Sequence, residues 1–185
     1  MSCQKTDPVI RTARLVLRRV RPEEDFAGIH AVLSAPKAMA YWSTPPHDSA
    51  QQTREWLAAM AATGPDEGDD FIIEYQGRTI GKAGFYRFPD IGYIIDPALW
   101  GQGIVAEALV PLIARAFTLY GQECLRADVD PRNAGSIRLL EKLGFAETHR
   151  AERTWHIAGQ WCDSVYFALS RQAWQAGTQS SLRTA

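Results

Sequence analysis

The residues most clearly spaced for chemistry lie between Asp90 and Glu107, in the stretch DIGYIIDPALWGQGIVAE. An apolar strand leads through a Pro-marked loop into a Gly-X-Gly turn, and a helix follows. Gly101 and Gly103 allow backbone angles and close approaches that a side chain would forbid. The start of the helix presents unpaired N–H groups and the positive end of its dipole. The pattern predicts an anion site that a phosphate could fill.

The same turn also agrees with a dinucleotide-binding fingerprint. Gly-X-Gly-X-X-Ala, from Gly101 to Ala106, opens a helix after a strand, and Asp128 lies 25 residues beyond Gly103. Such a fold usually places this unit first and repeats βαβ units, whereas here three antiparallel-looking strands and two helices precede the turn. A loop, DPALW, also separates the strand from the glycines. These features weigh against a dinucleotide fold.

A second motif, DPRNAGSIRLLEKLGF, supports a different interpretation. Together with GYIIDPALWGQGIVAEAL it strongly resembles the GNAT superfamily of acyl-CoA-dependent N-acetyltransferases, and within it the RimJ/RimL-like branch, from Thr12 to about Arg171. The resemblance implies an α/β (α+β) GNAT fold, with a mixed central sheet of about seven strands, a splayed V at the acyl-CoA site and about four flanking helices. It implies a single domain over residues 1–185, with a core at about 12–171, a short N-terminal tail and a disordered C-terminal tail.

The resemblance also implies where the acyl donor, acetyl-CoA, would bind. Backbone amides of the glycine turn would hold the pyrophosphate of coenzyme A, and the strand before the turn would pair with the pantetheine arm. Asn133 matches an Asn that contacts the coenzyme, and Ser136 matches a position that can lie near the thioester sulfur. The implied cofactor-binding residues are Ile94, Ile95, Gly101, Gln102, Gly103, Ile104, Val105, Ala106, Asn133 and Ser136.

The chain departs from the family pattern at three positions. Trp100 stands where the family often has Arg or Gln, so one fewer side chain can reach the phosphates. Val105 replaces a small residue in the turn. Leu140 replaces a Tyr that many members use as the general acid for the departing thiolate, and a leucine cannot donate a proton. The acid is therefore Ser136, a water molecule or nothing.

A candidate general base follows from the same resemblance. Asp90, in Asp-Ile-Gly-Tyr, matches a Glu that family members often carry at the start of the strand before the turn. A carboxylate there could take a proton from an ammonium substrate, directly or through water, or it simply forms a turn after Pro89. Tyr93 either lines the pocket or packs in the sheet. The candidate catalytic residues are Asp90, Ser136 and Tyr93, with His149 and His156 as second choices.

These residues imply direct transfer, in which a neutral amine attacks acetyl-CoA in a ternary complex. A backbone N–H on a bulged strand near Ile95 would hold the oxyanion. The acceptor is a small-molecule amine or a protein N-terminus, and an acidic loop from Asp66 to Asp70 would favour a cationic one if it bordered the pocket. No metal and no acyl-enzyme are implied. A non-catalytic acyl-CoA sensor of the same fold is the alternative, because fold does not determine function.

The elements that must position these residues follow from hydrophobic periodicity. Strands are predicted at RLVLRRV, FIIEY, TIGKAGFYRF, IGYIID and CLRADVD, with a closing hairpin at FAETHRAERTWHI and WCDSVYFAL. Helices are predicted over residues 22–36, 49–63, 103–120 and 136–144. The segment YWSTPPHDS, with the Tyr41–Trp42 pair, is predicted to be a loop that either borders a substrate pocket or fills the core.

Composition and charge limit the number of domains, the partners and the location that we expect. The 185 residues are 46% apolar and 22% charged, which suits one well-packed domain. A net charge of −1 gives no general attraction to nucleic acid or to anionic membranes. Cys3, Cys124 and Cys162 lack the pairing of a zinc site or a disulfide framework. No stretch has the length and apolar character of a signal peptide or a membrane span. We therefore expect a cytoplasmic protein, either a monomer or a homodimer.

Overall fold

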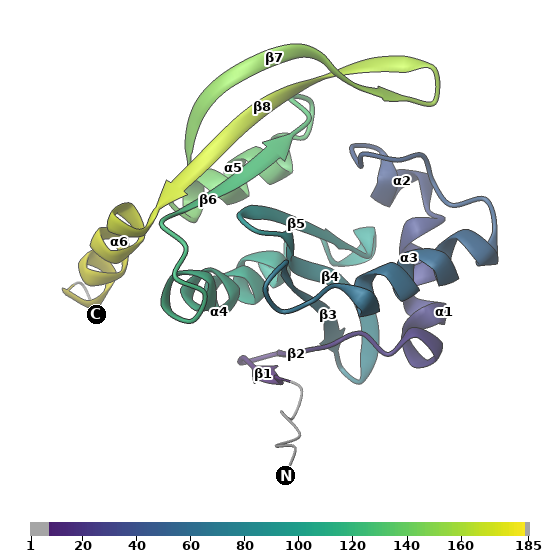
Figure 1. Ribbon diagram of the computed structural model, residues 1–185, viewed down its shortest axis with the longest axis horizontal. Helices are drawn as coiled ribbons and strands as arrows, with labels where there is room; N and C mark the ends of the chain where they lie inside the picture. The colour runs from purple at the N-terminus through teal and green to yellow at the C-terminus, as the bar shows by residue number, and fades with distance from the viewer. Residues whose placement is uncertain (1–7, 184–185) are drawn as a thin grey trace.

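The computed structural model describes residues 8–183, and Figure 1 shows how its elements are arranged. The strands are β1 (Ile10–Arg11), β2 (Leu15–Arg18), β3 (Asp69–Tyr75), β4 (Arg78–Arg87), β5 (Asp90–Ile95), β6 (Cys124–Val129), β7 (Ala146–Ile157) and β8 (Gln160–Ser170). The helices are α1 (Pro22–Leu33), α2 (Pro36–Met39), α3 (Ala50–Ala62), α4 (Ile104–Thr118), α5 (Ala134–Lys142) and α6 (Arg171–Arg183), with one 3-10 turn, η1 (Pro97–Leu99).

The strands form one mixed sheet in the order β1-β2-β3-β4-β5-β6-β8-β7. The pair β5–β6 is parallel, and every other neighbouring pair among the described strands is antiparallel. A dinucleotide fold requires a mostly parallel sheet, so this topology excludes it. The predicted mixed sheet is confirmed, with eight strands rather than about seven because the short β1 pairs with β2.

Two helices were not predicted. α2 is a single turn after Pro36. α6 occupies the tail that was predicted to be disordered, where Trp174 packs on Phe117 with ring centroids 6.5 Å apart. Arg171, at the start of α6, donates hydrogen bonds to the carbonyl oxygen of Gln122 at 2.7 and 3.1 Å. These contacts hold the start of α6 against the domain, whereas the disorder predicted for the rest of the tail stays a prediction.

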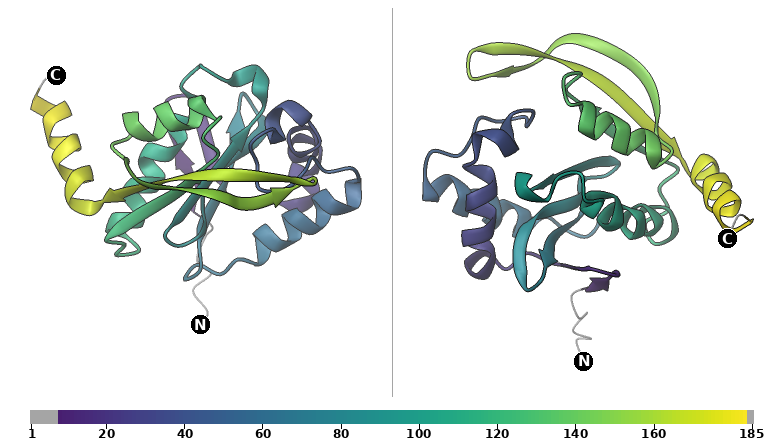
Figure 2. Two further views of the ribbon diagram at one scale, coloured as in Figure 1. Left: turned by 90° about the horizontal axis from the view of Figure 1, so that it is seen from above. Right: turned by 180° about the vertical axis from the view of Figure 1, so that it is seen from behind.

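Two apolar clusters cover the two faces of the sheet. One is formed with α4 and α5, and its central residues include Leu109, Leu112 and Phe117. The other is formed with α1, α2 and α3, and includes Ile29, Leu33 and Leu57. Figure 2 shows the two helix groups on opposite sides of the sheet. A group placed on one face is therefore separated from the other face by the sheet itself.

β5 and β6 share a single paired position, Asp90 with Arg126. There the N–H of Arg126 donates to the carbonyl oxygen of Pro89 at 3.0 Å. Both strands continue past this point without further pairing to each other, so their later backbone groups face a gap in the sheet. The predicted splayed V is present as a feature of the backbone.

The hairpin of β7 and β8 extends well beyond the sheet. β8 pairs with β6 over residues 165–170, and the rest of the hairpin has no strand beneath it. A register shift between Ala151 and Trp155 bends it, and Arg153 has a positive φ of 55° there. In Figure 1 the outer half curves over the open side of the sheet toward α2.

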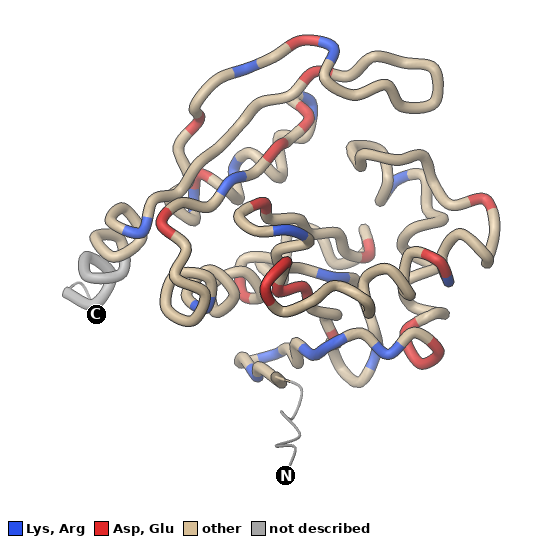
Figure 3. Tube along the Cα trace, viewed as in Figure 1, with Lys and Arg blue, Asp and Glu red and all other residues tan. Residues whose placement is uncertain are grey.

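Asp69 fixes α4 to the sheet. Its side chain is fully buried and accepts hydrogen bonds from Arg19 at 2.7 Å, Arg115 at 3.0 Å and Tyr120 at 2.9 Å. Asp69 was predicted to lie in a loop, but it is the first residue of β3. Figure 3 shows basic residues along the chain at β1 and β2. Because Arg115 is in the last turn of α4 and Tyr120 follows the helix directly, this network sets where the C-terminal end of α4 lies.

No helix within residues 8–183 combines the length and apolar character needed to cross a membrane. No group of three or more His, Cys, Asp or Glu residues is arranged there to hold a metal ion.

Replacing Asp69 should destabilise the fold strongly. Asp69→Ala leaves a cavity and two partly buried guanidinium groups without their fully buried acceptor, so we expect the free energy of unfolding to fall by about 3 kcal/mol. Urea unfolding followed by circular dichroism measures it. Asp66→Ala, on the exposed loop before β3, is the control and should change the free energy by less than about 0.5 kcal/mol. Equal effects of the two substitutions would contradict the role given to Asp69.

Candidate active site

The glycine turn before α4 has the geometry of an anion site. Gly101 and Gly103 have φ of 74° and 73°, in the left-handed region that favours glycine. Gly103 is the N-cap of α4, and no side chain caps the helix there. A Cβ on Gly101 would meet no atom within 4 Å, so the turn is open. The first N–H groups of α4 are thus available to a bound anion, as the sequence predicts.

Glu107, in the first turn of α4, links the glycine turn to the segment around Arg14. Glu107 accepts hydrogen bonds from the Nε of Arg14 at 2.6 Å, from its backbone N–H at 2.7 Å and from Thr12 at 2.5 Å. The same Arg14 donates through Nη1 to the carbonyl oxygen of Gln102 at 3.0 Å. Sequence reasoning missed this contact, because Arg14 and Glu107 are 93 residues apart and nothing local connects them.

The ionisation of Glu107 depends on these contacts. Partial burial by itself would raise the pKa of Glu107, but the hydrogen bonds from Thr12 and Arg14 outweigh it and hold the pKa below its usual value. The carboxylate is therefore charged at neutral pH and attracts the Arg14 guanidinium next to the turn.

The backbone of β5 presents every second residue to the V. The N–H of Asp96 donates to Ile80 on β4 at 2.8 Å, and at the other end the carbonyl of Pro89 accepts from Arg126 on β6. From Ile91 to Ile95 the strand is in continuous register with β4. Because backbone groups alternate along a strand, the residues whose N–H and C=O groups point into the V are Ile91, Tyr93 and Ile95.

This alternation refines two predictions. Ile94 is paired with Lys82 on β4, so its backbone groups belong to the sheet and Ile95 faces the V. β5 was predicted to be bulged, but the register shift falls on β4, at Tyr86. The predicted backbone donor near Ile95 does not need a bulge, since regular alternation already directs that N–H into the V.

Tyr93 and Ser136 meet on the α4–α5 face. Their hydroxyl oxygens are 2.5 Å apart, and either one can be the donor. Burial raises the pKa of Tyr93 to about 12, although the hydrogen bond with Ser136 lowers it somewhat, so the phenol is neutral. Asn133 caps α5 by accepting from the backbone N–H of Ser136 at 3.1 Å. Leu140 is fully buried.

Asp90 lies where β5 and β6 pair, and both of its oxygens are engaged. Oδ1 accepts from the Nε of Arg126 at 3.1 Å, and Oδ2 accepts from Arg87 at 3.2 Å and from Arg126 at 3.4 Å. The carboxylate therefore reinforces the one backbone pairing at the closed end of the V. It also lines the pocket described next.

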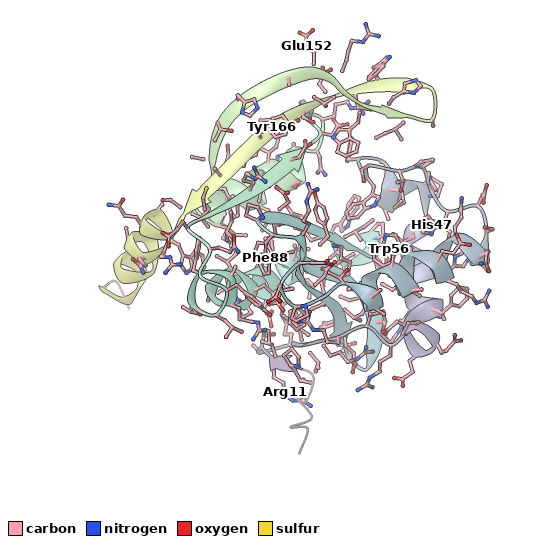
Figure 4. The ribbon with its side chains drawn as sticks, viewed as in Figure 1. Arg11, His47, Trp56, Phe88, Glu152 and Tyr166 are labelled. Carbon is pink, nitrogen blue, oxygen red and sulfur yellow. The ribbon has the colours of Figure 1, made fainter. Side chains whose placement is uncertain are left out.

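A pocket of about 810 Å³ lies on the opposite face of the sheet, beneath the outer half of the β7–β8 hairpin. We call it the hairpin pocket. Its lining comes from the loop after α2, from α3, from β3 to β6 and from the hairpin, with aromatic walls at Tyr41, Trp42, Trp56, Tyr86 and Trp155. Trp56 and His47, on the α3 side of the molecule, are labelled in Figure 4. The Tyr41–Trp42 loop borders this pocket, which was one of the two predicted alternatives.

The pocket floor contains a buried ion pair that sequence reasoning missed. Lys82, 2% exposed, donates to Asp70 at 2.8 Å. A Cβ on Gly92 would lie 3.3 Å from the Tyr86 ring and 3.4 Å from the Lys82 Nζ, so the glycine allows these two side chains to pack closely over β5. Of the acidic loop predicted to border the pocket, Asp70 lines it, but from within β3. The two residues come from adjacent strands with no local signal linking them.

The other candidate residues are more scattered. His149 stacks on Tyr166 with ring centroids 4.4 Å apart, and His156 packs against Trp161 at 4.9 Å. Neither histidine is among the residues that line the hairpin pocket. Cys124 is exposed, Cys162 lines the pocket, and Cys3 lies outside the described residues.

Two groups of candidate site residues lie on opposite faces of the sheet. The anion site and the Tyr93–Ser136 pair lie on the α4–α5 face. The hairpin pocket lies on the other face, and the unpaired edges of β5 and β6 separate the two. A phosphate-bearing donor and a second reactant can therefore approach each other through the V, which suits transfer of a group between them.

Comparison with known proteins agrees with this geometry. A family model described as "Acetyltransferase (GNAT) domain" matches residues 14–146. A Bacillus licheniformis protein named uncharacterized N-acetyltransferase p20 is 26% identical over 170 residues, covering 87% of this chain and 95% of the relative. The ribosomal protein uS5-alanine N-acetyltransferase of Escherichia coli (strain K12) is 33% identical over 87 residues, covering 47% of this chain and 45% of the relative.

A solved structure has a similar fold. The structure of RimL, a ribosomal L7/L12 alpha-N-protein acetyltransferase, superposes with a TM-score of 0.78, covering 92% of this chain and 98% of that one. The sequence identity is 18%, so this likeness concerns the fold alone.

Glu107 should make the glycine turn sensitive to acid. Glu107→Gln keeps a hydrogen-bond acceptor but removes the charge, so we expect the free energy of unfolding at pH 7 to fall by about 1–2 kcal/mol. Because the pKa of Glu107 is lowered on folding, its contribution is complete above the usual Glu pKa of about 4.3 and is lost as pH falls below it. The gap between wild type and variant, measured by urea unfolding, should therefore shrink toward pH 3.

The matched control is Glu123→Gln. Glu123 pairs with Arg171 at 3.1 Å but is 81% exposed, so its replacement should change the free energy by about 0–0.5 kcal/mol at pH 7. A Glu107→Gln gap that is the same at pH 3 and pH 7 would contradict the role of this carboxylate.

Proposed function

The chain belongs to the GNAT acetyltransferase family, and from that premise we propose that it transfers an acetyl group from acetyl-CoA to a primary amine by direct attack in a ternary complex. The observation that carries the proposal is the parting of β5 and β6 between an anion site on one face and the hairpin pocket on the other. The proposal treats the chain as one catalytic domain, since all the described strands belong to one sheet.

The donor side fits coenzyme A. The amides from Gly101 to Ala106, at an uncapped helix start, would hold its pyrophosphate. The groups of Tyr93 and Ile95 that point into the V would pair with the pantetheine arm, and the Asn133 side chain, which caps α5, lies at the second motif. When bound, acetyl-CoA supplies a thioester that an amine can attack.

Residues on the same side of the sheet would stabilise the oxyanion and supply a proton to the departing sulfur. The N–H groups of Tyr93 and Ile95 point into the V, where they can donate to an oxygen that gains negative charge. The Ser136 hydroxyl would donate a proton to the departing sulfur and recover one from the nitrogen of the tetrahedral intermediate, while Tyr93, neutral and in contact with Ser136, would orient that hydroxyl. This pair takes the part that the missing Tyr at Leu140 plays in other family members.

Asp90 remains the predicted general base, but its surroundings favour a second role. Two guanidinium groups already occupy its oxygens. Taking a proton from a substrate would weaken both ion pairs, at the position that joins β5 to β6. We therefore propose that Asp90 chiefly maintains the closed end of the V.

For the acceptor we favour a protein N-terminus over a small amine. The uS5-alanine N-acetyltransferase relative acts on the N-terminal residue type in its name, and the RimL-like fold neighbour is named for a protein substrate. The hairpin pocket has the size and open shape to admit the first residues of an extended peptide. The predicted cytoplasmic location and the oligomeric state stay predictions.

The test is thiol release. Purified protein, acetyl-CoA and a panel of alanine-starting, serine-starting and N-blocked peptides, polyamines and amino acids should give free coenzyme A thiol with a free N-terminal peptide. The N-blocked peptides are the control. Tight acetyl-CoA binding with no thiol release on any amine would instead support the alternative, a non-catalytic acyl-CoA sensor.

Gly103→Glu should abolish coenzyme binding. The new carboxylate would stand at the open helix start, where it repels phosphate and fills the space that glycine leaves. Titration calorimetry with coenzyme A should show at least a 100-fold loss of affinity, about 2.7 kcal/mol. Gly121→Glu is the matched control, because Gly121 has a similar positive φ of 64° and open surroundings but lies beyond the other end of α4. Normal coenzyme affinity in Gly103→Glu would refute the proposed phosphate site.

Ser136→Ala tests the proton donor. We expect kcat to fall by about 10²-fold, at the lower end of the range for acid-base catalysis, while the Kd for coenzyme A stays within about threefold. Tyr93→Phe should have a smaller effect on kcat, because Ser136 keeps its own proton. An unchanged kcat in Ser136→Ala would remove this hydroxyl from the mechanism.

A further inference from the structure

Asp128 is a carboxylate on the rim of the V that the predicted mechanism does not use. It lies on β6, is exposed, and lines the hairpin pocket. Its Oδ2 accepts a hydrogen bond from the indole Nε1 of Trp155 at 3.0 Å. Trp155 comes from the outer half of the hairpin, so this hydrogen bond adds to the pairing of β8 with β6 and ties the outer half to the same strand.

Asp128 differs from its acidic neighbours in how its carboxylate is paired. Asp90 is paired with Arg87 and Arg126, and Asp130 is paired with Arg132 at 2.5 Å. Among the described residues, no Lys, Arg or His forms an ion pair with Asp128. A carboxylate without a cationic partner at the edge of a partly enclosed pocket attracts a cationic ligand more strongly than a neutralised one.

The position of Asp128 suits a reacting amine. β5 and β6 run parallel from the Asp90–Arg126 pair, and Asp128 lies two residues beyond Arg126 on the same face of the sheet. Gly92 lies two residues beyond Asp90 on β5, also lining the hairpin pocket. The carboxylate thus stands across the V from Gly92, and the Tyr86 ring and the Lys82 Nζ lie over this glycine, 3.3 and 3.4 Å from where its Cβ would be.

We propose that Asp128 binds the ammonium group of the acceptor and removes its proton, with Trp155 as a positioning residue. This rests on the function proposed above. The N–H bond of the ammonium breaks and an O–H bond forms at Oδ1 of Asp128, while the electron pair stays on nitrogen as the nucleophile. The proton then passes from Asp128 to water at the open side of the pocket, which restores the carboxylate.

The hydrogen bond from Trp155 determines which oxygen of Asp128 is available to the acceptor. The indole N–H occupies Oδ2 and fixes the plane of the carboxylate, which leaves Oδ1 for the acceptor. Asp128 also lies near Tyr86, whose pKa is raised by burial first, then by Asp90, and also by Asp128. The titratable and charged groups of the elements around Asp128 are Tyr86, Arg87, Asp90, Arg126, Asp130 and Tyr166, together with Asp163, Cys162 and the Lys82–Asp70 ion pair, which line the same pocket.

Binding can be tested without acetyl-CoA. The indole N–H resonance of Trp155, assigned with Trp155→Phe, reports directly on Asp128 in an ¹⁵N–¹H NMR spectrum. Adding n-butylammonium chloride at pH 7 should shift this resonance in the wild-type protein, whereas n-butanol at the same concentration should not. Asp128→Asn keeps an oxygen that can accept from the indole, but it should lose the response to the amine.

The control is Glu152→Gln. Glu152 is exposed on β7, on the outer side of the hairpin in Figure 4, and it does not line the hairpin pocket. This variant should respond to n-butylammonium as the wild type does. A wild-type resonance that ignores the amine, or one that shifts equally in Asp128→Asn, overturns the assignment whether or not the protein acetylates amines.

Kinetics separate proton removal from simple binding. With an alanine-starting peptide, Asp128→Asn should lower kcat/KM by about 10²–10³-fold near pH 7. It should recover about tenfold per pH unit up to the pKa of the α-amine, near 8, because solvent then supplies neutral amine. Trp155→Phe should lower kcat/KM by less and leave the pH profile unchanged.

The possible results distinguish the two proposals. Thiol release by the wild type, together with an unchanged pH profile in Asp128→Asn, refutes Asp128 as the proton acceptor but leaves acetyl transfer standing. A strong loss in Asp90→Asn, with none in Asp128→Asn, would return the role to Asp90. No thiol release by the wild type on any amine refutes the proposed function, and the NMR experiment then still decides whether Asp128 binds ammonium.

Discussion

The structure depends on the point at which β5 and β6 stop pairing. A single parallel pairing, Asp90 with Arg126, joins two halves of an otherwise antiparallel sheet. Backbone N–H and C=O groups beyond that point have no strand partner, and buried backbone groups must find one. A ligand that pairs with them repairs the sheet, so the fold itself prepares a binding site. The ion pairs of Asp90 at this position strengthen the joint from which the two strands diverge.

Ion pairs fix the position of α4, whose N-terminal end forms part of the proposed acetyl-CoA site. Asp69 joins the C-terminal part of α4 to β3, while Glu107 joins its first turn to Arg14 near β2. α4 is therefore fixed at both ends, and its uncapped start meets the glycine turn in a defined position. Such ion pairs contribute less to net stability than their geometry suggests, because desolvation opposes them. Their effect here is to determine where the helix lies relative to the V.

The acidic residues near the V divide into two groups with different uses. Asp90 and Asp130 are neutralised by arginines and support the backbone. Asp128 carries no such partner among the described residues and is instead oriented by an indole from the hairpin. The hairpin thereby both lines the pocket and contacts the Asp128 carboxylate. In the proposed mechanism, binding and deprotonation of the acceptor would therefore depend on this one element, which extends beyond the sheet.

Much of this protein was determined by short stretches of sequence. The glycine turn, the strand–turn–helix order and the Asn133 cap of α5 are local, because they depend on residues a few positions apart. The contacts that define the site are not local: Tyr93–Ser136, Arg14–Glu107 and Trp155–Asp128 span 43, 93 and 27 residues. Periodicity cannot reveal which distant side chains meet, nor which carboxylates a neighbouring arginine neutralises. The sequence alone therefore determined the anion site and the family resemblance. Tertiary packing decided which acid remains available to an amine.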